Sequence, residues 1–220
     1  MAAVNSLLME WGSVDKLTIR AVAKEVGVAA PSIYLHFADK AELVWAALSD
    51  KYDDLVARMA AADEAADGAG PRERLRAQAQ TYCRFALNNP GHYRLMFEVR
   101  QPVVEASRIS AHPARHVSAS LRAGLLRCQV SGYALSQPVE QAAQTLWAGL
   151  HGTVALHHSL FRDDSTEALT LNLADGLIDL LVAPGKSPLL PSAPAETAAS
   201  RQVKAILAGT AGDAGSDEQP

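Results

Sequence analysis

The chain has 220 residues, of which 49% are hydrophobic and 5% aromatic, and its formal net charge at pH 7 is −4. This length allows one domain or two small ones with a sizeable core, and the charge argues against a uniformly basic, nucleic-acid-binding surface. We find no apolar run of about 18 residues and no signal peptide. We therefore expect a soluble, cytoplasmic protein that does not bind a membrane.

Signals of β-structure are almost absent, since the sequence has no sustained alternation of Val, Ile and Thr and no Asn-Gly hairpin turn. The predicted fold class is therefore all-α. The two cysteines, Cys83 and Cys128, are too few for a disulfide framework and lack the spacing of metal ligands. We expect both to be buried thiols in a reducing cytoplasm.

The first twelve residues are predicted to form a helix, because four apolar side chains share one face and a glycine follows them (Val4, Leu7, Leu8, Trp11 and Gly12). Two further short helices, joined by a tight turn, are predicted between Thr18 and Lys40. Thr18 is a favourable N-cap for the first of them, which would bury one face (Ile19, Val22, Ala23 and Val26). Gly27 can adopt the positive φ of a sharp turn, after which Val28 is predicted to point inward.

The second of these helices contains Pro31, which suits a first helical turn because the missing N–H has no intrahelical partner there. Ile33 and Phe37 would bury one face, and the other side chains would point outward (Ser32, Leu35 and His36, with Tyr34 at the edge). A helix-turn-helix has this arrangement, in which the second helix presents its N-terminal residues to base edges in the major groove.

The stretch GVAAPSIYLHFADKAEL resembles the DNA-binding signature of the TetR family of one-component transcriptional regulators. The shared features are a Gly-Val turn, then Ile-Tyr-x-His-Phe, and then a Lys before a long helix. The resemblance covers roughly residues 5–48. Two departures stand out. The sequence begins partway into the first helix of the family, so that either the true start lies upstream or the protein does without the basic arm that precedes this helix, and Ala29 stands where the family often has Ser or Thr.

The resemblance implies DNA contacts from both helices of the motif. Thr18, Tyr34 and Lys40 would contact phosphates, which position a protein without reading sequence. The base edges would be read through hydrogen bonds and contacts with thymine methyl groups by Arg20, Ala30, Ser32, Leu35 and His36. Residues 1–52 contain five Lys or Arg and six acids, so affinity should depend on geometry and dimerisation more than on bulk charge. The alternative is an ordinary solvated helix face.

A capping box of Asp39 and Glu42 is predicted to open a long helix that runs to about residue 66 and connects the DNA-binding part to the body. The segment from Asp67 to Pro71 breaks this helix, and Pro71 starts the next one. Further helices are predicted over 92–97, 117–133, 138–160 and 164–182, with a loop or bent segment between Pro102 and Pro113.

These elements predict three parts. Residues 1–48 would form the helix-turn-helix domain, and residues 49–183 a helical bundle for ligand binding and dimerisation. Residues 184–220 are rich in Pro, Ala and Gly and are expected to be a disordered tail, in which the spacing of Val203, Ile206 and Leu207 allows one short helix.

Two stretches of the body also resemble the family. LWAGLHGTVALHH is similar to the Trp-x-x-x-His-Gly feature of the WHG-type C-terminal domain within the TetR group, and NPGHYRLMF is similar to a stretch common in the bodies of this family. In family members the last two long helices pack against their twins in a four-helix interface, which implies a homodimer. The residues that suit this interface are Gly149, Gly152, Leu169, Leu173, Leu177, Ile178 and Leu181.

The bundled body helices of the family imply a mostly apolar pocket for a small hydrophobic or amphipathic effector. The candidate lining residues, each of which could instead be plain core, are Tyr82, Phe85, Tyr93, Met96, Phe97, Leu121, Leu125, Trp147 and His151. We predict no metal site and no cofactor. His157 and His158 are adjacent and so point about 100° apart on a helix, and no carboxylate lies four residues from His151.

The function predicted from these features is a transcriptional regulator, most often a repressor in this family, that binds an inverted-repeat DNA operator as a dimer and is released by an effector. The alternative is an all-α small-molecule-binding or interaction protein that does not bind DNA specifically. An enzyme is not predicted, because the sequence has no Gly-x-Ser-x-Gly, phosphate-loop or His-Glu-x-x-His motif.

Overall fold

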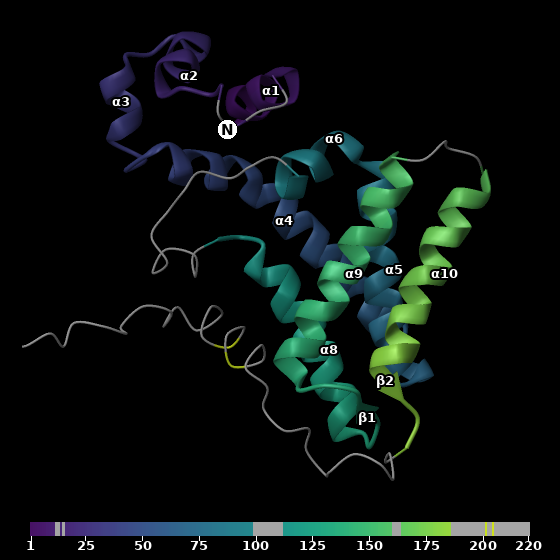
Figure 1. The fold of residues 1–220 in the computed structure, drawn as a ribbon. Coiled ribbons are helices and arrows are strands. Elements are labelled where there is room, and N and C mark those ends of the chain that lie inside the picture. The colour runs from purple at the N-terminus through teal and green to yellow at the C-terminus, as the bar shows by residue number, and fades with distance from the viewer. Residues whose placement is uncertain are drawn as a thin grey trace, which may run out of the picture.

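The computed structural model describes residues 1–11, 14, 16–98, 112–159, 164–185, 201 and 204. Its elements confirm the all-α prediction (Figure 1). The first four helices are α1 (Ala2–Trp11), α2 (Ile19–Val26), α3 (Ala30–Tyr34) and α4 (Lys40–Ala65). The body then contains the 3₁₀ turn η1 (Asp67–Ala69), α5 (Pro71–Asn88), α6 (Pro90–Tyr93), the π-helical turn η2 (Arg94–Glu98), α8 (Arg115–Val130), α9 (Val139–Ser159) and α10 (Asp164–Leu181).

The only β-structure among the described residues is one pair of two-residue strands, β1 (Ala134–Leu135) and β2 (Val182–Ala183). They pair antiparallel, with Ala134 opposite Ala183. The pair ties the chain after α8 to the end of α10. Apart from residues 184, 185, 201 and 204, the predicted tail lies outside the described residues, as does most of the segment between Pro102 and Pro113.

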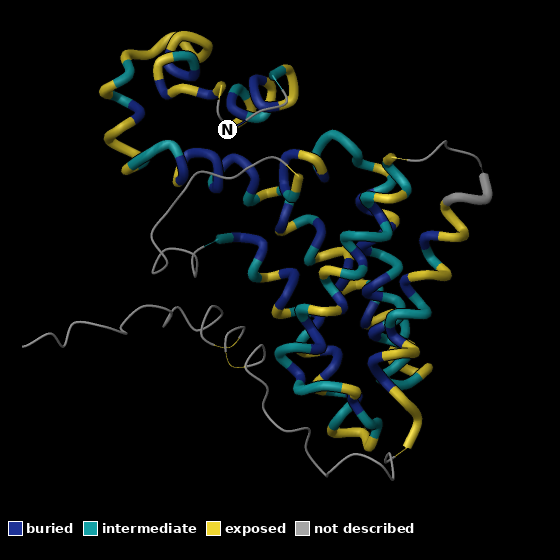
Figure 2. The backbone as a smooth tube through the Cα atoms, viewed as in Figure 1, coloured by how far each residue is buried: buried dark blue, intermediate teal, exposed yellow. Residues whose placement is uncertain are grey.

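The molecule has a small head, which we define as α1–α3 with the first turns of α4, and a larger helical body (Figure 1). The long helix α4 runs from the head into the body. In the body, α5 packs against α4, α8, α9 and α10, and its inward side chains Leu75, Ala79 and Tyr82 are completely buried. Figure 2 shows the buried positions following the inner faces of these helices. None of the described helices is long and apolar enough to cross a membrane.

The local signals around the head act as the sequence predicts. The Thr18 hydroxyl oxygen accepts a hydrogen bond from the Ala21 N–H at 3.1 Å, and Gly27 ends α2 with a φ of 71°. The Asp39 carboxylate accepts from the Glu42 N–H at 2.9 Å, and the Glu42 carboxylate accepts from the Ala38 N–H at 2.7 Å. These bonds satisfy N–H groups at the start of each helix.

Two apolar residues of the head lie differently from the prediction. Val26 is 48% exposed and Val28 is 46% exposed, although both were expected to face the core. Val26 is the last residue of α2, so no further turn covers it. The left-handed conformation of Gly27 redirects the chain, and Val28 therefore faces solvent.

Candidate DNA-binding interface and body site

Helix α3 and the turn after it have one buried side and one exposed side, as a recognition helix has. Ile33 is 7% exposed and Phe37 packs against the core, whereas Tyr34 is 57% and Leu35 is 83% exposed. His36 is also exposed, and Ser32 is half-buried. Because α3 ends at Tyr34, Leu35 and His36 lie in the turn that follows, where the N–H groups of His36 and Phe37 both donate to the Ile33 carbonyl at 3.0 Å.

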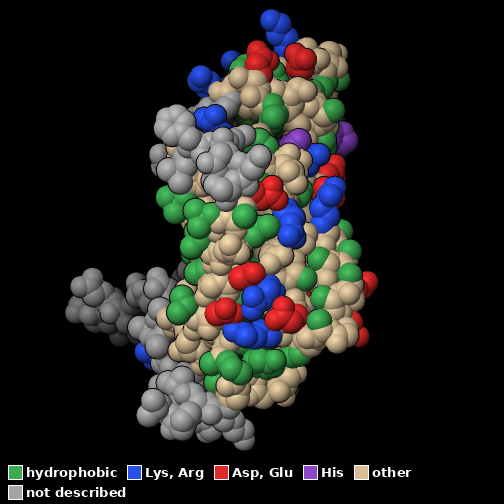
Figure 3. All heavy atoms as spheres, turned by 90° about the vertical axis from the view of Figure 1, so that its right-hand side faces the viewer, with side chains coloured by type: hydrophobic (Ala, Val, Ile, Leu, Met, Phe, Trp, Pro, Cys, Tyr) green, Lys and Arg blue, Asp and Glu red, His purple; other side chains and the backbone are tan. Residues whose placement is uncertain are grey.

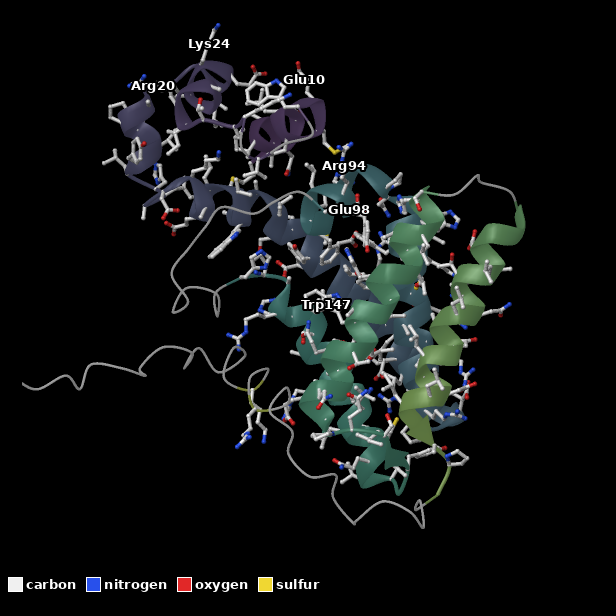
Figure 4. The ribbon with its side chains drawn as sticks, viewed as in Figure 1. Glu10, Arg20, Lys24, Arg94, Glu98 and Trp147 are labelled. Carbon is white, nitrogen blue, oxygen red and sulfur yellow. The ribbon has the colours of Figure 1, made fainter. Side chains whose placement is uncertain are left out.

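A shallow groove of about 520 Å³ brings together four of the eight predicted DNA-contact residues. Thr18, Arg20, Tyr34 and Lys40 line it, along with Leu17, Ile19 and Asp39. The groove therefore combines the start of α2, the end of α3 and the start of α4. Figure 4 shows Arg20 at the outer edge of the head. The remaining predicted residues, Ala30, Ser32, Leu35 and His36, lie on α3 and the turn after it.

Sequence reasoning left Pro31 out of the predicted contact set. It is exposed in the first turn of α3, next to Ala30. The sequence carried a signal for it, since a proline in a first turn lies at the end of the helix that is predicted to present its N-terminal residues to DNA. Ala29, which precedes the helix, makes no side-chain cap.

In the body, five of the nine predicted pocket residues form one cluster of rings. Phe97 has its ring centroid 5.1 Å from that of Tyr93 and 6.0 Å from that of Tyr82, and its contacts extend to Trp147 at 6.1 Å and His151 at 5.9 Å. Tyr82 and Tyr93 are completely buried, while the other three are partly buried. The remaining four, Phe85, Met96, Leu121 and Leu125, are buried core residues.

Burial is the main cause of the shifted pKa values in this cluster. It lowers the pKa of His151, an effect that the Glu98 carboxylate opposes, and it raises the pKa of Tyr82 and of Tyr93. The Tyr93 hydroxyl and the His151 Nδ1 are hydrogen-bonded. The neighbouring histidines have other partners, since His158 stacks on Tyr93 at 5.5 Å and His157 Nδ1 lies 3.3 Å from the Thr170 hydroxyl. Within the described residues no three His, Cys, Asp or Glu side chains are grouped as metal ligands.

Two family models match this chain. Residues 8–47 match the model of bacterial regulatory proteins of the tetR family, and residues 75–174 match the tetracyclin repressor-like C-terminal domain. The chain belongs to the TetR family of transcriptional regulators.

A solved structure supports the fold of this TetR-family regulator. The crystal structure of "putative regulatory protein SCO4313" aligns with a TM-score of 0.53 and 22% sequence identity, over 79% of this chain and 94% of that chain. At this identity the likeness concerns the fold alone. No curated protein matches the sequence of the regulator. The WHG subtype of the body stays a prediction, because the matched C-terminal model is the tetracyclin repressor-like one.

The predicted dimer-interface residues do not all lie on one surface of the regulator. Ile178 and Leu181 are buried within the single chain, so they are not available to a partner. Leu177 packs inside the chain against Gly149, where an added Cβ would lie 2.6 Å from a Leu177 methyl group. Leu177, Ile178 and Leu181 are covered because α10 packs on α9 and α5.

The outward face of α10 carries a second apolar stripe. Leu169, Leu173 and Leu180 are exposed, and they share a face because they are four and seven residues apart. Leu156 is exposed on α9, and Gly152, one turn before it, has open space at its Cβ position. Leu156 and Leu180 were missing from the predicted set, although the spacing of Leu180 could have revealed it.

Ion pairs within the chain hold α10 on α5 beside this stripe. Arg72 contacts Asp179 at 2.5 Å, and Arg76 contacts Asp179 at 2.9 Å and Asp175 at 3.6 Å. Figure 3 shows a compact group of acidic and basic side chains on this side of the molecule, with hydrophobic side chains next to it. Because these charges are paired inside one chain, they place α10 without requiring a partner.

Both cysteines are free and buried, as the sequence predicts. Burial raises the pKa of Cys83 to about 12 and that of Cys128 to about 11. Since the thiolate is the reactive form, both side chains act as small apolar core residues.

Proposed function

We propose that this regulator is a repressor that binds an inverted-repeat operator as a homodimer and leaves it when a small effector enters the body. The observation that carries the proposal is the exposure of Leu35, which is 83% solvent-accessible beside the groove formed by Thr18, Arg20, Tyr34 and Lys40. A leucine held outward at the end of a short helix gains apolar burial when it meets a thymine methyl group in the major groove.

The exposed groups divide into two roles. The Thr18 and Tyr34 hydroxyls and the Lys40 ammonium would contact phosphates, and such contacts would fix the register of the head on the duplex. The base edges would be contacted by Arg20, Ala30, Ser32, Leu35 and His36, with Pro31 as a further apolar contact. The recognition helix α3 is only five residues long, so each head would read a short half-site and specificity would require two heads.

The stripe of Leu169, Leu173 and Leu180, together with Leu156 and Gly152, is the proposed dimer face. Its exposed leucines would be buried between α9 and α10 of the two subunits, and Gly152 would allow close helix approach. A dimer of this kind must hold its two recognition helices about 34 Å apart to read adjacent major grooves.

The long helix α4 is the proposed connection between effector and operator. It begins in the head at Lys40, and its residue Tyr52 donates a hydrogen bond to the Met96 carbonyl oxygen at 2.5 Å in the body. A body that repacks around an effector would therefore move α4 and change the separation of the heads. The effector acts only through its difference in affinity for the two arrangements.

The test is selection and sequencing of DNA fragments retained by the purified full-length protein, followed by gel-shift titration at one fixed salt concentration. We expect an inverted repeat whose half-sites are about one helical turn apart, and weaker binding when either half is scrambled. If the protein retained all DNA fragments equally, the operator proposal would be refuted, and an all-α protein that does not bind DNA specifically would be favoured. A screen of small molecules for release of the selected fragment then tests the effector role.

A further inference from the structure

An apolar stripe runs along the outer face of α8, and we call it the α8 stripe. It consists of Ala119, Ala123, Leu126 and Val130, all of which are exposed, Val130 to 79%. Residues three or four positions apart lie on the same side of a helix, so these side chains form one continuous strip. Single exposed apolar residues are common, whereas a continuous strip indicates a surface that another segment contacts.

An acidic group borders the α8 stripe. Glu140, in the first turn of α9, accepts a hydrogen bond at 2.9 Å from Arg122 of α8. Arg122 lies one turn from Ala119 and one turn from Leu126, and therefore next to the stripe. The Glu140 side chain is 13% exposed and that of Arg122 is 42% exposed. The pair thus fixes a carboxylate at the edge of the stripe.

The chain after α10 leaves the body beside the C-terminal end of α8. Strand β2 pairs with β1, which follows α8, and the Ser136 N–H donates to the Leu181 carbonyl oxygen at 3.0 Å. Figure 1 shows this pair at the end of the body that lies away from the head. Residues 186–200 can span up to about 50 Å, whereas the 16 residues of α8 are about 24 Å long. The chain beyond residue 200 can therefore reach any part of the stripe.

Two described residues beyond that point carry positive charges. Arg201 and Lys204 have helical backbone and exposed side chains. Burial alone would raise the pKa of Glu140, but the Arg122 guanidinium, a backbone hydrogen bond and the charge of Lys204 together lower it. Lys204 is thus close enough to act on the carboxylate that borders the stripe. At helical spacing, three apolar residues would share another side of this segment (Val203, Ile206 and Leu207).

We propose that the segment 201–207 docks on the α8 stripe of its own chain. Lys204 joins the Arg122–Glu140 pair, and the apolar side of the segment covers Leu126 and Val130. Removal of apolar surface from water favours this arrangement, and the opposite charges fix its register. The inference goes beyond the proposed function and is independent of operator binding, because its contacts lie in the body and the tail.

The tether favours this segment over a separate partner. Attachment through residues 186–200 gives the segment an effective concentration of roughly millimolar at the stripe. A second copy of the chain or another protein would need a similar free concentration to compete. The charge of Lys204 and the spacing of the apolar residues also match the acidic edge and the apolar strip that the segment meets.

The experiment measures disulfide formation in full-length double variants under mild oxidation with diamide. Ala123→Cys places a thiol in the α8 stripe, and Gln202→Cys places one in the segment. The native Cys83 and Cys128 are buried and have raised thiol pKa values, so they react slowly. We expect the intramolecular disulfide to form at least about tenfold faster than in the matched pair Ala61→Cys and Gln202→Cys, since Ala61 is an exposed alanine of α4.

Charge reversal tests the register. Adding Lys204→Glu to the Ala123–Gln202 cysteine pair should slow the disulfide roughly 2- to 5-fold, the range of one exposed ion pair, and a further Glu140→Lys should restore the rate. Arg201→Glu is the matched control, because Lys204 and not Arg201 acts on Glu140, and it should change the rate less.

Three results would overturn the proposal. The first is an equal rate for the Ala123 and Ala61 pairs, and the second is an equal effect of Lys204→Glu and Arg201→Glu. The third is a disulfide that joins two chains, which is detected by mixing the two single-cysteine proteins and would make a second copy the occupant. If Ala123→Cys lowers the melting temperature, Ala119→Cys takes its place and is judged by the same outcomes.

Discussion

Asp63 provides the sharpest test of how the body fixes the far end of α4. Its carboxylate lies in the last turns of this helix and is 7% exposed. It accepts hydrogen bonds from Arg74 and Gln78 of α5, the latter at 2.9 Å, and from Arg127 of α8. One acidic group therefore joins three helices, and Asp63→Ala removes all three connections at once.

The size of the effect follows from burial. Removing one partner of a fully buried ion pair costs roughly 3–5 kcal/mol, because the remaining charge stays desolvated. Here the two arginines are partly exposed, and Arg74 also contacts Asp67. We therefore expect a smaller loss in the free energy of unfolding, about 2 kcal/mol after discounting for solvent.

Asp54→Ala is the matched control on the same helix. Asp54 pairs with Arg58 at 2.9 Å, but both side chains are largely exposed, so its loss should stay within about 0.5 kcal/mol. Both substitutions gain similar helix propensity, which cancels in the comparison. Urea unfolding followed by circular dichroism, repeated at several protein concentrations because a dimer's stability depends on them, measures the difference. Equal midpoints for the two variants would refute the reasoning.

The remaining predictions concern DNA, the dimer and pH. Tyr34→Phe should weaken operator binding by about 1 kcal/mol, the net worth of one hydrogen bond, without lowering the melting temperature; an unchanged gel-shift affinity would contradict a phosphate role. Leu35→Ala should reduce discrimination between operator and scrambled DNA more than it reduces non-specific binding, and equal losses on both would mean that Leu35 reads no base. Leu173→Glu, on the exposed stripe of α10, should produce monomers in analytical ultracentrifugation, whereas a persistent dimer would place the interface elsewhere. Burial lowers the pKa of His112 below its ordinary 6.5. As the pH drops below 6.5, the unfolded chain therefore binds a proton at His112 before the folded chain does, and the free energy of unfolding falls. The His112→Gln variant should lose less stability on acidification than the wild type, and identical pH profiles of stability for the two proteins would exclude His112 as the cause.

Much of the head could be predicted from the sequence because its determinants are local. The N-cap at Thr18, the left-handed Gly27 and the pair Asp39–Glu42 each act within a few residues, and each is found where the sequence placed it. Val28 shows the limit of this reasoning. The direction of the Val28 side chain depends on the backbone path after the left-handed Gly27, and the hydrophobicity of Val28 alone does not predict that path.

Helix α10 shows what periodicity cannot decide. It has one apolar stripe through Ala174, Ile178 and Leu181 and another through Leu169 and Leu173. Both stripes have helical spacing, so the sequence pattern treats them alike. Only packing against α5 and α9 shows that the first stripe belongs to the core and that the second remains exposed in the single chain.

The sequence by itself determined the helices, their order and the outward face of α3, because caps, breakers and apolar spacing operate over one or two turns. The tertiary structure alone decided which distant side chains meet, such as Asp63 with Arg127 and Phe97 with Trp147. Such contacts join residues far apart in the chain and depend on how whole helices pack, which no local pattern encodes.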